Sequence, residues 1–232
     1  GLSAAAHLGE HATLVDDGPA LGGSQCALDP NLARSLSERA AASGATLLAR
    51  TTAVALLREP QTSTGELTAL LVGPRNTLVV TCEAVLLATG RHDSVPAFPN
   101  NDLPGIFSAR AALLAWQSDV LVGSPLALVG SGRFAERLAE QLEGAVDLLR
   151  LDEAQVVRAV GRERITGVEV RTEKGTRRLK VSALAFDGPG SPSFELCVQA
   201  SASVELAPEA GYFPLVDAQG RAGERLYVAG GL

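Results

Sequence analysis

A short glycine-rich segment has the residue types and spacing that most clearly suggest chemistry. Gly130-Ser131-Gly132-Arg133-Phe134-Ala135 follows the apolar run Leu126–Val129 and precedes a helical pattern over 134–142. In such a G-x-G-x-x-A turn the first glycine permits the tight turn, the second lets backbone approach a pyrophosphate, and the small third residue lets helix and strand pack. Free N–H groups at the helix start then favour phosphate. Gly130, Gly132 and Ala135 are therefore predicted cofactor-binding residues; a turn of the same shape with an empty pocket is the alternative.

The first residues of the chain suggest half of a second such motif. Gly1 precedes the small-residue stretch 2–6, as the third glycine of a dinucleotide turn precedes its helix. The first glycine would then lie five residues upstream of Gly1, and Asp17 would fall about 20 residues after it, where an acid binds the ribose. A solvated strand end is the alternative for Asp17. The strand and the two other glycines are missing from this sequence.

The elements that must position these residues alternate between helix and strand. Asp29-Pro30 is a helix start, because Asp caps and Pro suits the first helical position, and Gly44 is a helix stop. The remaining elements are expected as helices over 2–8 and 134–142 and as strands over 12–16, 45–48, 53–57, 67–72, 77–81, 84–90, 126–129, 146–151, 155–160, 165–171, 176–181, 183–186 and 226–229. This order predicts two related α/β halves, each with an added β-ribbon.

Composition excludes several classes of function. The 232 residues carry a net charge of −6, which argues against a nucleic-acid surface, and no apolar stretch approaches the roughly 18 residues of a membrane helix. Cys26, Cys82 and Cys197 form no CxxC pair, so no local metal or dithiol site and a reducing, cytoplasmic location are expected. The sequence offers no metal site and no catalytic acid–base pair or nucleophile. Because Met is absent, a native start is expected upstream, or has been removed.

The order of short motifs along the chain carries a family resemblance. The motifs are Gly1-Leu2-Ser3-Ala4-Ala5, Leu14-Val15-Asp16-Asp17-Gly18-Pro19-Ala20-Leu21-Gly22-Gly23-Ser24, Leu86-Leu87-Ala88-Thr89-Gly90, Gly130 to Ala135 and Tyr227-Val228-Ala229-Gly230-Gly231. They occur in the order typical of flavoprotein reductases with two dinucleotide-binding domains. The segments 49–54 and 98–107 further resemble the alpha-type subunits of sarcosine oxidase, opine oxidase, hydrogen cyanide synthase and dye-linked proline dehydrogenase.

This resemblance implies a nucleotide-binding, electron-transfer subunit of a multi-subunit amine or amino-acid dehydrogenase or oxidase, acting on CH–NH donors. It implies FAD, NAD or another adenine nucleotide as cofactor, a flavin-containing amine-oxidising subunit as partner, and a small iron–sulfur subunit as a further option. By position, Gly1, Gly22 and Gly23 would lie near the pyrophosphate and Asp17 at the ribose. Thr89 and Gly90 would line the crossover between domains, and Gly230 and Gly231 would end the last strand, where flavin-binding members have Gly-Asp.

The expected fold is α/β, with two Rossmann-like, three-layer nucleotide-binding domains. The first would comprise 1–105 and 183–232 and lack its N-terminal strand; the second, a shortened NAD(P)-type domain, would comprise 106–182 and be inserted in the first. Two alternatives to the subunit function stay open. One is a stand-alone NAD(P)H-dependent FAD reductase, and the other is a non-catalytic structural subunit with degenerate nucleotide pockets.

Overall fold

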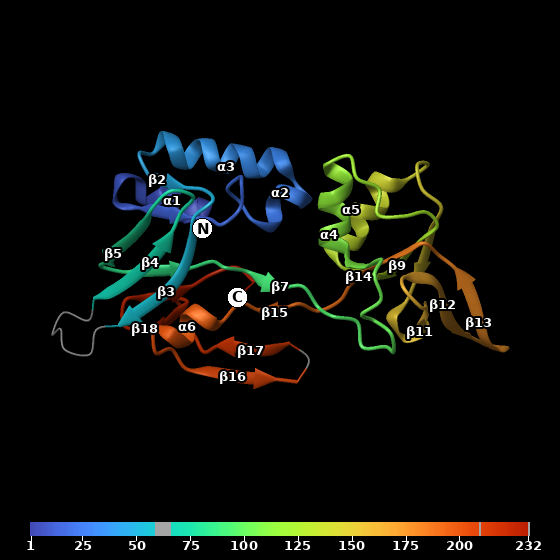
Figure 1. The fold of residues 1–232 in the computed structure, drawn as a ribbon. Helices are drawn as coiled ribbons and strands as arrows, with labels where there is room; N and C mark the ends of the chain where they lie inside the picture. The colour runs from blue at the N-terminus through green and yellow to red at the C-terminus, as the bar shows by residue number, and fades with distance from the viewer. Residues whose placement is uncertain (59–65, 209, 232) are drawn as a thin grey trace. The chain divides into compact units, whose positions relative to one another are not determined.

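The computed structural model describes residues 1–58, 66–208 and 210–231. Helices and strands alternate along the chain, which divides into two compact units (Figure 1). Unit 1 combines Gly1–His92 with Ser191–Leu232, and unit 2 is Asp93–Gly190. The mixed architecture with parallel strands confirms the predicted α/β class. None of the helices in the described ranges is long and apolar enough to cross a membrane.

The first part of unit 1 packs two helices against a pair of parallel strands. Its elements are α1 (Leu2–Leu8), η1 (Gly9–His11), β1 (Thr13–Val15), α2 (Ser24–Leu28), α3 (Pro30–Ala42) and β2 (Thr46–Leu48). The Asp29 side chain caps α3 by accepting the Leu32 N–H at 3.0 Å, as the sequence predicts. Helices α1 and α3 lie side by side (Figure 1), with Ala5 and Ala40 buried in their common core. β1 pairs in register with β2.

The rest of unit 1 consists of small sheets around a second core. Their elements are β3 (Thr52–Arg58), β4 (Leu67–Val72), β5 (Thr77–Cys82), β6 (Val85–Leu87), β7 (Arg91–His92), β15 (Ser191–Pro192), α6 (Glu195–Gln199), β16 (Val204–Ala207), β17 (Gly211–Pro214), β18 (Arg221–Gly223) and β19 (Leu226–Val228). Strands β3–β5 form the antiparallel ribbon expected from the sequence, and β6 pairs in parallel with β19. Among the described strands, β1 pairs only with β2 and β6 only with β19; a further strand upstream of Gly1 stays a prediction.

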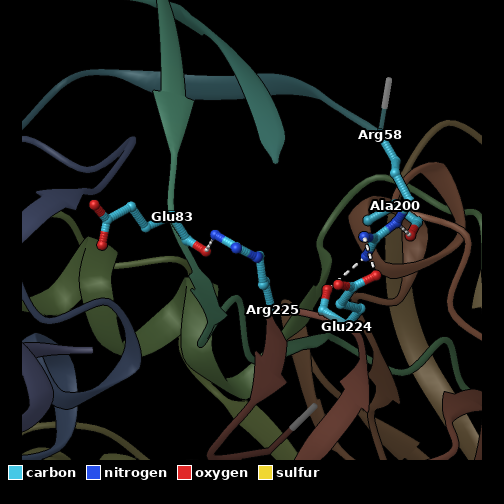
Figure 2. Close-up of polar contacts among 5 residues, drawn as sticks. All are labelled: Arg58, Glu83, Ala200, Glu224 and Arg225. Atoms are coloured by element: carbon cyan, nitrogen blue, oxygen red, sulfur yellow. Dashed lines mark hydrogen bonds and ion pairs between the residues drawn. The ribbon is translucent and has the colours of Figure 1, made fainter. Parts of the chain in front are cut away.

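Two arginines tie the elements of this second core together (Figure 2). Arg58 at the end of β3 donates to the carbonyl oxygens of Ala200, at 3.4 Å, and Glu224, at 2.6 Å. Arg225, in the turn between β18 and β19, donates to the Glu83 carbonyl at 3.2 Å (Figure 2). These bonds join the ribbon, the segment after α6 and the β18–β19 turn, and they hold the starts of β6 and β19 together within unit 1.

Unit 2 is a three-layer structure around a parallel sheet. Its elements are β8 (Ile106–Ser108), α4 (Ala109–Gln117), β9 (Leu126–Gly130), α5 (Arg133–Leu142), β10 (Leu148–Leu151), η2 (Glu153–Gln155), β11 (Val156–Gly161), β12 (Ile165–Thr172), β13 (Gly175–Lys180) and β14 (Ala183–Asp187). The sheet order is β10-β9-β14-β8, with all neighbours parallel. Helices α4 and α5 cover one face and the ribbon β11–β13 the other (Figure 1). Burial on both faces explains why β9 reads as a continuous apolar run.

The structure corrects the predicted domain boundaries. The sequence places 183–190 in the first domain, but β14 lies between β9 and β8 in the sheet of unit 2. It also leaves 93–105 in the first domain, whereas Phe98 is part of the core of unit 2. The reason is strand pairing that the sequence pattern does not reveal: β14 pairs with both β9 and β8, so residues 183–187 complete the sheet of unit 2.

Candidate functional site

The carboxyl end of β1 and the start of α1 meet in unit 1. A Cβ at Gly1 would lie 3.2 Å from the Leu14 side chain and 3.8 Å from Ala88, so Gly1 lies between β1 and the residue that follows β6. A Cβ at Gly22 (φ +123°) would lie 3.4 Å from the Leu2 side chain. The structure therefore brings Gly1 and Gly22 together at the ends of parallel strands, where open α/β sheets bind ligands.

Asp16, rather than Asp17, organises the loop after β1. Its carboxylate accepts the N–H of Gly18 at 2.9 Å and of Gly22 at 3.0 Å. The Gly18 carbonyl in turn accepts the Arg50 N–H at 2.9 Å. Asp17 is exposed at the start of this loop. Sequence reasoning missed Asp16, although an Asp two residues before a Gly is the usual signal of a side chain that closes a turn on its own backbone.

Three of the predicted glycines have backbone that no side chain covers. Gly23, Gly90 and Gly230 have φ of +52°, +74° and +89°, and no heavy atom lies within 4 Å of where a Cβ would be. The left-handed conformation alone favours glycine. The open space beside the peptide also lets a ligand approach the backbone closely. Gly144 (φ +73°) is similarly open in a turn of unit 2, so openness by itself does not identify a binding residue.

The segment after β6 is held by backbone contacts on both sides. The Thr89 hydroxyl donates to the Ser193 carbonyl at 3.1 Å, and the Gly90 carbonyl accepts the Ser193 N–H at 3.0 Å. The Arg91 Nε donates to the Gly231 carbonyl at 2.8 Å. Thr89, Gly90 and Gly231 are thus brought together at the carboxyl ends of β6 and β19. Arg91 adds a positive charge that sequence reasoning missed.

In unit 2 the glycine turn has the expected shape and an unexpected neighbour. Gly130 (φ +95°) ends β9, Gly132 precedes α5, and Ala135 is fully buried against the sheet. The Ala135 N–H donates to Asp187 Oδ2 at 2.7 Å. A Cβ on Gly132 would lie 2.6 Å from Asp187 Cγ, so the carboxylate fills the space that this glycine leaves. Burial raises the pKa of Asp187, while hydrogen bonds from the backbone of Ala135 and Phe134 oppose that rise.

Other potentially reactive side chains are His92 and the three cysteines. His92 and Glu195 form an exposed pair at 2.9 Å. All three cysteines are free, and desolvation raises the pKa of each thiol, in Cys197 to about 11. No cluster of metal-ligating side chains is found among the described residues. At the carboxyl ends of β1, β6 and β19, the described part of unit 1 thus brings together the Gly22 N–H, the Thr89 hydroxyl and the Arg91 guanidinium, which hydrogen-bond Asp16, Ser193 and Gly231 respectively.

Comparison with solved structures supports the fold. L-proline dehydrogenase from P. horikoshii matches with a TM-score of 0.79 and 23% identity, over 98% of this chain and 48% of that chain. T. acidophilum thioredoxin reductase matches with a TM-score of 0.71 and 15% identity, over 100% of this chain and 86% of that chain. An NAD-dependent persulfide reductase from A. fulgidus matches with a TM-score of 0.68 and 14% identity, over 99% of this chain and 51% of that chain.

The chain spans about half the length of the first and third of these proteins. No model of a protein family matches it, and no curated protein sequence matches it significantly. At these identities the similarity establishes that the chain has the mixed α/β fold of these dehydrogenase and reductase structures.

Proposed function

We propose that this chain is the nucleotide-binding, electron-transfer subunit of an amine or amino-acid dehydrogenase or oxidase acting on CH–NH donors, and that unit 1 binds the nucleotide. The observation that carries the proposal is the gathering of Gly1, Gly22, Thr89 and Gly90 at the carboxyl ends of β1 and β6. The similarity to L-proline dehydrogenase over 98% of this chain supports the CH–NH donor class.

The residues of unit 1 fit an adenine nucleotide such as FAD or NAD. Gly23, Gly90 and Gly230 leave uncovered backbone where a phosphate or ribityl chain could approach. Asp17 is exposed, so its carboxylate is accessible to ribose hydroxyls. The hydrogen bonds of Asp16 hold the loop that carries it. A bound flavin would supply the redox chemistry. The protein would supply binding, orientation and charge.

The proposed partners follow from this division of roles. A flavin-containing subunit would oxidise the amine, and a small iron–sulfur subunit is a further candidate. The three unpaired cysteines favour a reducing, cytoplasmic location. A second candidate function is a stand-alone NAD(P)H-dependent FAD reductase; in its favour, the chain matches 86% of a thioredoxin reductase. It requires a nicotinamide nucleotide in unit 2.

The test is an absorption spectrum of the chain purified with its partners, together with mass identification of the released nucleotide. Gly90→Ala and Gly144→Ala form a matched pair, since both glycines have nearly equal φ and open space at Cβ. We expect Gly90→Ala to lose bound nucleotide and Gly144→Ala to retain it. Flavin in an isolated chain that oxidises NAD(P)H would favour the reductase. A colourless, nucleotide-free complex would refute both enzyme functions and leave a structural subunit.

A further inference from the structure

The glycine turn of unit 2 already holds an anion that belongs to the chain itself. Strand β14 pairs in parallel with β9, and the register places Asp187 opposite Gly130. Asp187 thus stands at the carboxyl end of its strand, beside the turn that leads into α5. Its carboxylate extends over Gly132 and reaches the first turn of that helix.

The hydrogen-bond donors that a pyrophosphate would use are occupied. At the start of a helix, the free N–H groups and the positive end of the dipole bind phosphate. Here the Ala135 N–H donates to Asp187 Oδ2 at 2.7 Å, and the Phe134 backbone also bonds this carboxylate. A phosphate oxygen in the same position would have to displace the carboxylate.

The space that the glycines provide is also used. A Cβ on Gly130 would overlap the Asp187 carbonyl, whose carbon would lie 3.0 Å away. A Cβ on Gly132 would lie 2.6 Å and 2.7 Å from Cγ and Oδ1 of the same residue. The backbone of Asp187 thus fills the space beside Gly130, whose φ of +95° also favours glycine, and the Asp187 carboxylate fills the space beside Gly132. Their presence does not indicate that a ligand approaches the turn.

Charges of both signs lie around the turn: Arg133 begins α5, and two other arginines of unit 2 are paired with acids. Arg150, at the end of β10, forms an ion pair with Glu136 on α5. Arg110 pairs with Asp93 at 3.1 Å, and Asp93 adds a negative charge that raises the pKa of Asp187. A pyrophosphate would bring further negative charge next to these carboxylates, in a setting where like charges repel strongly.

From these contacts we infer that Asp187 acts as an internal substitute for phosphate and closes the glycine turn of unit 2 to dinucleotides. Nucleotide binding is then confined to unit 1, and electrons do not enter this chain from a nicotinamide on unit 2. The inference does not depend on which nucleotide unit 1 holds. It separates the two enzyme functions above, because only the reductase needs NAD(P)H in unit 2.

The experiment compares NADH and NADPH binding by the wild-type chain, Asp187→Ser and Asp187→Asn. The Ser variant removes the charge and opens space; the Asn variant removes the charge, keeps one acceptor oxygen and puts an NH2 group in place of the other. Asp147→Ser is the control, because it removes an exposed carboxylate of unit 2 away from the turn. The first readout is the quenching of Trp116 emission by bound NADH, whose absorption overlaps that emission. Trp116 is the only Trp and lies on α4, which packs beside α5. Hydrogen exchange of residues 130–135 locates the binding.

We expect wild type and Asp147→Ser to show no protection at 130–135 up to about 1 mM nucleotide, the upper end of usual substrate affinities, whether or not unit 1 binds NADH. Asp187→Ser should bind NADH and NADPH at least tenfold more tightly than the wild type, with protection at 130–135. Asp187→Asn should show a smaller increase in affinity. Circular dichroism verifies that each variant is folded. The inference is overturned if the wild type binds as tightly as Asp187→Ser with the same protection. It is equally overturned if both folded Asp187 variants fail to bind.

Discussion

Removing the Asp16 carboxylate should loosen the loop that precedes Gly22 without unfolding the chain. Asp16→Ala deletes two hydrogen bonds, to the N–H groups of Gly18 and Gly22 at 2.9 and 3.0 Å. Hydrogen bonds to a charged group are worth about 1.5–3 kcal/mol each, and partial exposure reduces that value. We therefore expect a loss of about 1–2 kcal/mol in local stability, which corresponds to roughly 5–30-fold faster opening.

Amide hydrogen exchange measures this change at the two bonds themselves. The Gly18 and Gly22 amides should exchange faster in Asp16→Ala, and those of α3 should not change. Asp16→Asn should have a smaller effect, because one side-chain oxygen still accepts. Asp17→Asn is the matched control, since Asp17 is exposed and neither of these bonds involves it. Equal exchange at Gly18 and Gly22 in wild type and Asp16→Ala, or an equal effect of Asp17→Asn, would refute the role given to Asp16.

Three further outcomes test the packing and the electrostatics. Cys197 is fully buried and its pKa is about 11 against an ordinary 9.0, so its contribution to stability is complete below pH 9 and is lost by about pH 11. The melting temperature of the wild type should therefore fall between pH 9 and pH 11, and that of Cys197→Ala should fall less over the same range. Asp29→Ala removes the cap of α3 and should cost about 0.5–2 kcal/mol in urea unfolding, whereas the exposed Glu38→Ala should change little. Gly130→Ala forces a Cβ onto the Asp187 carbonyl at φ +95°, so unit 2 should unfold, which circular dichroism would detect as a loss of secondary structure. A stable, native-like variant would contradict this geometry.

Elements whose ends carry local capping chemistry could be predicted from the sequence. The Asp29-Pro30 start and the Gly44 stop bracket α3, because a cap and a left-handed glycine act within one turn. The apolar run Leu126–Val129 predicts β9 for a similar reason, since burial on both faces leaves a continuous pattern. Local signals therefore give three of the six α-helices in the described residues (α1, α3 and α5) and the longer strands, and with them the α/β class.

Features set by tertiary pairing could not be predicted in the same way. Ile106–Ser108 is too short to show a strand period, and β14 belongs to unit 2 only because it pairs with this strand and with β9. The choice between Asp16 and Asp17 depends on which carboxylate faces the loop, which adjacent acids in a sequence do not reveal. The predicted binding roles of Gly23, Gly90 and Gly230 remain predictions that nucleotide content must test.

The turn at Gly130–Ala135 explains why a glycine motif is an incomplete guide to ligand binding. Glycines at 130 and 132 are needed wherever an anion must approach the start of α5 closely, and the motif does not say where the anion comes from. Here the deciding residue lies 52 positions after Ala135, on the strand that pairs with β9. In a parallel sheet, the residue opposite the first glycine is set by strand register, so register must be known before the motif is interpreted. An acid at that position, as at Asp187, competes for the same N–H groups and space as a bound pyrophosphate would.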